Sequence, residues 1–149
     1  MRLKFVAYDR RFLLASRTWL RDPEIAALTM TPAFTDEGQE RWFAELPSKT
    51  DYLVWGVELQ SQPVGVIGLK RIQERSAEYF GYLGEKAIWG QGYGSEMVET
   101  ALAAAKARGC SVVSLRVWRE NPRAISLYRR LGFELVGEKG SALHMERHV

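Results

Sequence analysis

The segment Ile88-Trp89-Gly90-Gln91-Gly92-Tyr93-Gly94-Ser95 places three alternating glycines between a predicted strand and a predicted helix. Glycine adopts positive φ angles at little steric cost, so such a run lets successive backbone N–H groups converge on one point. The helix that follows begins there with unpaired N–H groups and the positive end of its dipole. Together these features predict a binding site for an anion such as a pyrophosphate.

Two common phosphate-binding motifs do not describe this segment. A Walker A loop requires Gly-Lys-Ser/Thr, and the segment has no lysine. A Rossmann fingerprint has the longer spacing Gly-x-Gly-x-x-Gly and an acidic residue on the next strand. Here the next predicted strand, Val112–Trp118, carries no acid. These differences argue against a general nucleotide-binding α/β domain.

The second half of the chain has clear periodicity. Apolar residues recur at helical spacing from Ser95 to Arg108, and Gly109 follows where a C-terminal cap is expected. Val112–Trp118 alternates as a strand does. Asn121 and Pro122 suit the N-cap and first turn of another helix, which we expect to end at Gly132. The last predicted strands are Phe133–Val136 and Ala142–His148.

The first half predicts a strand, two helices and three further strands. These are Leu3–Val6, a helix from Arg10 to Leu20, a helix from Thr35-Asp36, Tyr52–Leu59, Val64–Leu69 after a turn at Gln60–Pro63, and Ala77–Leu83. The fold class is therefore α/β (α+β), with a mixed, mostly antiparallel sheet of six or seven strands and helices on both faces. We expect one domain spanning residues 1–149.

Composition narrows the function classes. The chain has 149 residues, 46% hydrophobic and 26% charged, which is typical of a globular domain. No apolar stretch is long enough to span a membrane, and the N-terminus has no signal-like run, so we expect a cytoplasmic protein without membrane partners. The net charge of +3 is scattered, which argues against nucleic acid. With a single cysteine, Cys110, and only His144 and His148, we expect no metal site.

Two blocks of the sequence resemble the GNAT N-acetyltransferase superfamily. Trp89 to Gly94 resembles its pyrophosphate loop, Gln/Arg-x-x-Gly-x-Gly/Ala, with Trp89 where the family usually has Gln or Arg. Asn121 to Tyr128, followed by Leu131-Gly132-Phe133, resembles its Asn-x-x-Ala-x-x-Leu-Tyr…Leu-Gly-Phe block. Trp19 to Ile25 resembles a segment of the ribosomal-protein N-terminal acetyltransferases and of relatives that acetylate nucleotide-linked amino sugars.

The resemblance implies a GNAT fold and acetyl-CoA as cosubstrate. The strand Ala77–Leu83 is expected to splay from Val112–Trp118 so that pantetheine pairs with backbone groups near Tyr82, Leu83 and Gly84. A backbone N–H near Leu83 is expected to hold the oxyanion. The expected cofactor-binding residues are Tyr82, Leu83, Gly84, Trp89, Gly90, Gln91, Gly92, Tyr93, Gly94, Ser95, Asn121 and Tyr128.

The resemblance also implies the catalytic groups. Tyr128 is expected to protonate the thiolate of coenzyme A, a task that suits a phenol that is neutral at pH 7. Many relatives carry a glutamate where this chain has Arg116, which cannot act as a base. Glu78, on the strand expected to splay, is the next candidate for the general base, directly or through water. Trp19, Phe34, Trp42 and Tyr79 are candidates for an acceptor pocket.

The sequence is compatible with more than one class of acceptor. A protein N-terminus, a small-molecule amine and a nucleotide-linked amino sugar are all compatible with the resemblance, and each would be acetylated by direct attack in a ternary complex. A non-catalytic acyl-CoA sensor is the alternative of another class, although the presence of Tyr128 favours an enzyme. The chain is expected to be a monomer or a homodimer.

Overall fold

Seven strands join into one twisted sheet in the computed structural model, which describes residues 2–149. Their order is β1-β2-β3-β4-β5-β7-β6, and every neighbouring pair is antiparallel except β4 and β5, which are parallel. The predicted mixed, mostly antiparallel sheet is confirmed. The strands are β1 (Leu3–Ala7), β2 (Leu53–Leu59), β3 (Gln62–Lys70), β4 (Ser76–Leu83), β5 (Val112–Trp118), β6 (Glu134–Lys139) and β7 (Ala142–His148).

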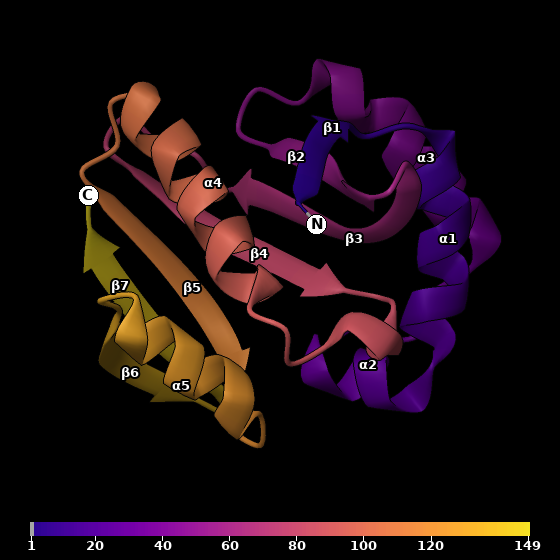
Figure 1. Ribbon diagram of the computed structural model, residues 1–149. Helices are drawn as coiled ribbons and strands as arrows, with labels where there is room; N and C mark the ends of the chain where they lie inside the picture. The colour runs from indigo at the N-terminus through magenta and orange to yellow at the C-terminus, as the bar shows by residue number, and fades with distance from the viewer. Residues whose placement is uncertain (1) are drawn as a thin grey trace.

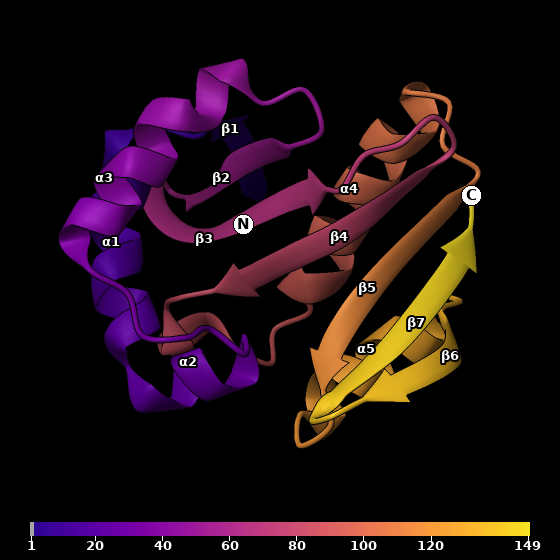
Figure 2. The same ribbon diagram turned by 180° about the vertical axis from the view of Figure 1, so that it is seen from behind.

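Helices lie on both faces of the sheet, as predicted (Figures 1 and 2). Helices α4 and α5 cover one face, and Trp19 of α1 and Ile25 of α2 pack on the other against Val66 of β3. The helices are α1 (Arg10–Arg21), α2 (Pro23–Leu28), α3 (Asp36–Glu45), α4 (Tyr93–Ala107) and α5 (Pro122–Arg130), with short 3₁₀ turns η1 (Leu46–Ser48) and η2 (Lys86–Ile88). Among residues 2–149, no helix has the length and apolar character needed to cross a membrane.

Helix α2 is absent from the sequence prediction, which ends the first helix at Leu20 and begins the next at Thr35-Asp36. Asp22 both follows α1 and caps α2, because its side chain accepts hydrogen bonds from the N–H groups of Glu24 and Ile25 at 2.9 and 3.2 Å. Pro23 then occupies the first helical position, where its missing N–H is not needed. The same two residues therefore stop one helix and start the next.

Three predicted boundaries also shift. The β2–β3 turn consists of Gln60 and Ser61, with φ of 51° and 67°, because positive φ at both positions matches the twist of a two-residue hairpin. Helix α4 begins at Tyr93 instead of Ser95, and the strand expected at Phe133–Val136 is β6, Glu134–Lys139.

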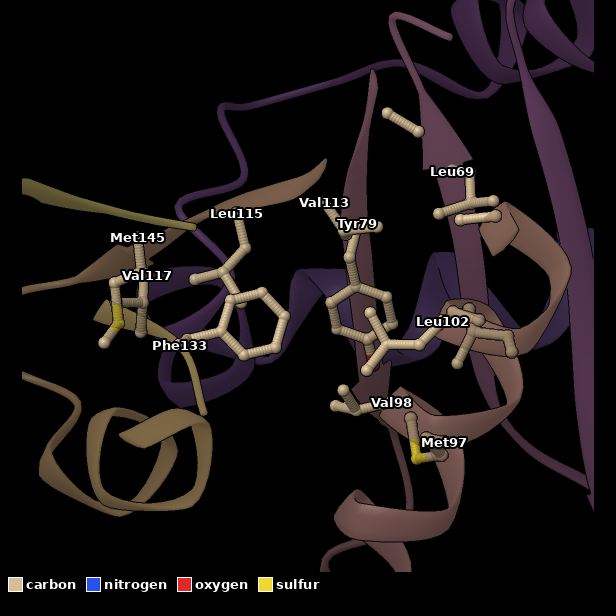
Figure 3. Packing of buried hydrophobic residues seen from close by; sticks show 14 of the residues in the cluster. Leu69, Tyr79, Met97, Val98, Leu102, Val113, Leu115, Val117, Phe133 and Met145 are labelled. Carbon is tan, nitrogen blue, oxygen red and sulfur yellow. The ribbon is translucent and has the colours of Figure 1, made fainter. Parts of the chain in front are cut away.

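The larger core lies between the sheet and the α4–α5 layer. Tyr79 of β4 and Leu69 of β3 pack there against Val98 and Leu102 of α4. Figure 3 shows the Tyr79 ring beside Val98 and Leu102, while Leu115, Val117, Phe133 and Met145 gather at the β5 end of the same core. This packing holds β4 in place from the face of the sheet that carries α4 and α5.

Helix α1 approaches the opposite face of the sheet very closely at Gly56 of β2. A Cβ built on Gly56 would lie 2.2 Å from the Phe12 ring, which is fully buried. A side chain there must displace the ring of a close-packed core. Close contact of α1 with β2 therefore depends on a glycine at this position.

We expect Gly56→Ala to lower the free energy of unfolding by roughly 1–3 kcal/mol, the usual range for overpacking a core. Gly137→Ala is the matched control, because a Cβ at Gly137 of β6 would meet no atom within 4 Å. Urea denaturation of both variants measures the effect. Equal stability of the two variants would show that Phe12 repacks freely.

Candidate active site

The strands β4 and β5 pair only where they begin. Their register contains Ser76 with Val112, Ala77 with Val113 and Glu78 with Ser114, and pairing then stops although both strands continue. Figure 2 shows the two strands diverging from this point. The predicted splay of the two strands is therefore present, and it leaves a gap inside the sheet.

The register of β4 decides which of its backbone groups face that gap. The N–H of Gly84 donates to the carbonyl of Val64 at 2.8 Å, continuing the antiparallel register of β3 and β4. Because hydrogen-bonding direction alternates along a strand, Gly84 and Tyr82 direct their backbone groups to β3. Gly81 and Leu83 direct theirs to the gap. Of Tyr82, Leu83 and Gly84, only Leu83 therefore turns its backbone to the gap, where its N–H can meet a ligand while its carbonyl accepts the indole N–H of Trp89.

A cleft of about 1240 Å³ occupies the gap and continues on both sides of the sheet. Ten of the predicted cofactor-binding residues line it, namely Tyr82, Leu83, Trp89, Gly90, Gly92, Tyr93, Gly94, Ser95, Asn121 and Tyr128. Gly84 does not line it, because Gly84 packs against the Trp19 ring, which a Cβ would meet at 2.1 Å.

The glycine-rich loop has the predicted geometry. Gly90 and Gly92 have φ of 77° and 87°, and added Cβ atoms there would meet nothing within 4 Å. Gly92 is the N-cap of α4 and supplies no capping side chain, so the first N–H groups of this helix stay available. Gly94 has another role, because a Cβ there would lie 2.7 Å from Leu127 of α5. The loop is thus a backbone anion site at the N-terminus of a long helix.

Trp89 and Gln91 hold the loop in place. The indole N–H of Trp89 donates to the carbonyl of Leu83 at 2.9 Å and so ties the loop to the end of β4. The side-chain amide of Gln91 donates to the carbonyl of Ala87 at 3.3 Å, and Gln91 does not line the cleft. Trp89 stands where the family usually has Gln or Arg, and its indole supports the loop by a hydrogen bond to a backbone carbonyl.

Asn121 and Tyr128 bring α5 to the other wall of the cleft. The Asn121 carbonyl oxygen accepts the N–H of Ala124 at 3.3 Å, which is the predicted N-cap. The Tyr128 ring lies edge to face with Tyr79 at a centroid distance of 6.3 Å. Burial raises the pKa of Tyr128 to about 12, so its hydroxyl keeps its proton at physiological pH.

Glu78, the candidate general base, lies at the fork of β4 and β5 among three cations. Glu78 is 7% exposed and forms ion pairs with Lys70 at 3.5 Å, Arg71 at 3.3 Å and Arg116 at 3.4 Å. It lines a separate, smaller hollow together with Ser114 and not the main cleft. The three ion pairs join β3, the β3–β4 turn and β5 at the fork, and the role of Glu78 as a base stays a prediction.

Sequence reasoning missed most of the cleft wall on the α1–α3 side. Trp42 lines it as proposed, and Tyr79 lines it from the core, whereas Trp19 and Phe34 do not. The unexpected lining residues are Tyr8, Tyr52, Phe80, Lys70 and Arg116. The rings of Tyr8 and Tyr52 each lie edge to face with Trp42, at centroid distances of 5.5 and 6.1 Å. Burial raises the pKa of both phenols, that of Tyr8 to about 12.

The two histidines and the cysteine lie outside the cleft. Cys110 is buried after α4, and His144 lines the smaller hollow beside Glu78. Within residues 2–149, no group of three or more His, Cys, Asp or Glu side chains is arranged to hold a metal ion.

The acetyltransferase (GNAT) family matches residues 16–133 of this sequence. The chain belongs to this family. The predicted acyltransferase class and GNAT fold are thereby confirmed, and acetyl-CoA is the cosubstrate of the family. The match contains both the glycine-rich loop and α5, so the two sequence blocks that carry the resemblance lie on the two walls of the cleft.

Individual relatives agree with the family. An uncharacterised N-acetyltransferase of Methanocaldococcus jannaschii is 34% identical over 101 residues, which are 63% of this chain and 45% of that protein. The chain therefore spans about half the length of this curated relative. A spermidine N-acetyltransferase from Vibrio cholerae, solved with CoA and spermine, superposes with a TM-score of 0.87 at 21% identity, covering 98% of this chain and 95% of that one. The PaiA N-acetyltransferase from Thermoplasma acidophilum, solved with coenzyme A, gives 0.78 at 23% identity over the whole of both chains.

The variant Gly92→Glu should abolish detectable acetyl-CoA binding, because it places a carboxylate where the phosphates would lie. The matched control is Gly140→Glu, since Gly140 also has positive φ, 60°, and open space around its Cβ position. Calorimetric titration of both folded variants measures affinity. Wild-type affinity in Gly92→Glu would contradict the anion site at α4.

The variant Glu78→Gln should lose about 2 kcal/mol of stability, because three cations lose their shared carboxylate. Its rate should keep the wild-type pH profile with the same acceptor. Glu146→Gln is the control, since Glu146 lines the same hollow but is exposed. An ionisation that disappears only in Glu78→Gln would identify Glu78 as the base.

Proposed function

We propose that residues 1–149 act as one N-acetyltransferase domain that transfers the acetyl group of acetyl-CoA to a primary amine within a ternary complex. The observation that carries the proposal is the cleft between β4 and β5, which is lined both by the N-terminus of α4 and by Tyr128. The same cleft thus contains an anion site at α4, the unpaired edge of β4 and a candidate proton donor, Tyr128.

The cofactor would bind mainly through the backbone. Its pyrophosphate would accept hydrogen bonds from the first N–H groups of α4, after Gly92. The guanidinium groups of Arg123 and Arg130, which line the cleft from α5, would balance the remaining phosphate charge. Pantetheine would then pair with the edge of β4 at Gly81 and Leu83, as an added strand does.

The reaction would follow direct attack. The neutral amine adds to the thioester carbonyl, and a backbone N–H of Gly81 or Leu83 donates to the oxyanion that forms. The C–S bond then breaks, and Tyr128 gives its proton to the leaving thiolate. The nitrogen then gives its extra proton to water, and water returns a proton to the Tyr128 phenolate.

The acceptor would enter from the face that carries α1, α2 and α3. Helices α4 and α5 cover the other face, where the cofactor phosphates bind. On the open side, α2 contacts β5, and the loop from Thr29 to Pro32 borders the cleft. The spermidine N-acetyltransferase of similar fold, solved with CoA and spermine, supports an amine as the acceptor.

The variant Tyr128→Phe should lower turnover by roughly 10-fold to 100-fold, the scale expected for loss of one proton donor. Acetyl-CoA affinity should stay near that of wild type, because the phosphate and backbone contacts are kept. Steady-state kinetics together with equilibrium binding separate the two quantities. A variant with wild-type turnover would mean that solvent protonates the thiolate.

The pH dependence tests the same role of Tyr128. Because its pKa is about 12, the phenol stays protonated well above neutral pH. The wild-type rate should therefore rise with acceptor deprotonation and show no decline between about pH 7 and 10. A rate that declines in wild type but not in Tyr128→Phe would contradict the raised pKa.

A further inference from the structure

Two cations line the cleft on the side from which the acceptor would enter. Lys70 of β3 lies opposite Glu78 in the register, and Glu78 lies opposite Ser114 of β5. Arg116, two residues after Ser114, shares its face of the sheet because side chains alternate along a strand. Both Lys70 and Arg116 line the main cleft, at the point where β4 and β5 separate.

The charges at this point do not cancel. Lys70, Arg71 and Arg116 all pair with one carboxylate, that of Glu78, so this ion cluster holds three cations and one acid. The acid of the adjoining smaller hollow, Glu146, is exposed to solvent, and Glu120 lines the main cleft only after the end of β5. On α2, Glu24 shares Lys86 with Asp22, at 2.9 Å each. The excess of positive charge is therefore local, and the space beside Lys70 and Arg116 favours a negative group.

Arg116 has donors to spare for such a group. Only its Nε contacts Glu78, at 3.4 Å, and neither of its two terminal nitrogens has a hydrogen-bond partner in residues 2–149. A guanidinium fork matches the two oxygens of a carboxylate or phosphate.

A nearby anion would also stabilise the charged form of Lys70. Its ammonium lies 5.6 Å from the Phe80 ring centroid, and burial lowers its pKa more than Glu78 raises it. A second negative charge nearby would favour its charged form.

A polyamine would meet the opposite situation. Its second ammonium would enter the space beside Lys70 and Arg116, where like charges repel it. The similarity to a spermidine N-acetyltransferase, at 21% identity, concerns the fold. The charges that line this cleft thus separate the chain from that acceptor class.

We propose that the amine acceptor of this enzyme carries an anionic group, a carboxylate or a phosphate, which binds Arg116 and Lys70. The proposal rests on the N-acetyltransferase function proposed above and names the acceptor class of that site. The aromatic wall of Tyr8, Trp42, Tyr52 and Phe80 adjoins the two cations and would receive the uncharged part of the acceptor.

The test compares primary amines that share a four-carbon chain but differ in the charge at the far end. These are 4-aminobutyrate, butylamine and putrescine, with 2-aminoethyl phosphate as the phosphate probe. We expect kcat/KM for 4-aminobutyrate or 2-aminoethyl phosphate to exceed that for putrescine at least 10-fold, the scale of one charge-assisted pair. The better of the two anionic probes identifies which anion the site prefers.

The variants Arg116→Gln and Lys70→Gln should each reduce this anion-to-putrescine ratio about 10-fold. Arg71→Gln is the matched control, because Arg71 also pairs with Glu78 but does not line the main cleft, so its ratio should stay unchanged. An equal loss in all three variants would overturn the proposal and indicate a general change in the ion cluster.

Two further outcomes separate this proposal from the one on which it rests. If putrescine is acetylated as well as or better than the anionic amines, the acceptor class is wrong and the N-acetyltransferase function stands. If acetyl-CoA binds with measurable affinity but none of the amines is acetylated, the proposed function fails, and the acceptor class fails with it. Calorimetric binding of acetyl-CoA, measured in every variant, distinguishes these results.

Discussion

The structure depends on one interruption in its backbone hydrogen bonding, the separation of β4 from β5 after Glu78 and Ser114. Two parallel strands that run side by side normally continue to pair, so the separation needs support on both faces. On one face, Tyr79 packs against α4 and α5. On the other, Glu78 holds cations from β3, from the β3–β4 turn and from β5. A packed ring and an ion cluster together keep the fork open.

The two faces of the fork offer different chemical groups to a ligand. The face of α4 and α5 offers backbone donors at Gly92 and a strand edge at Leu83, which suit a cofactor that does not change. The opposite face offers side chains, mainly aromatic rings and the cations Lys70 and Arg116. Backbone donors constrain the side chains little, so residues on the second face can vary with the acceptor while the first face keeps the cofactor site.

The sequence predicted the parts of the site that depend on local patterns. The anion loop and the Asn121 cap follow from glycine geometry and from capping preferences over a few residues. Helix α2 was missed because Asp22 carries a stop signal and a start signal at once. The roles of Tyr82, Gly84 and Glu78 depend on pairing with β3 and β5, which one strand's sequence does not specify. Likewise, Lys70 and Arg116 lie near each other only because β3, β4 and β5 are neighbours in the sheet.

The separation also leaves the inner edges of both strands without a strand partner beyond Glu78 and Ser114 in residues 2–149. Any molecule that completes these edges binds the folded chain and not the unfolded one, so it stabilises the fold by mass action. Steady-state abundance of such a protein responds to changes of one or two kcal/mol, through proteolysis of its unfolded fraction. The lifetime of this chain under proteolysis would then lengthen as the concentration of acetyl-CoA rises.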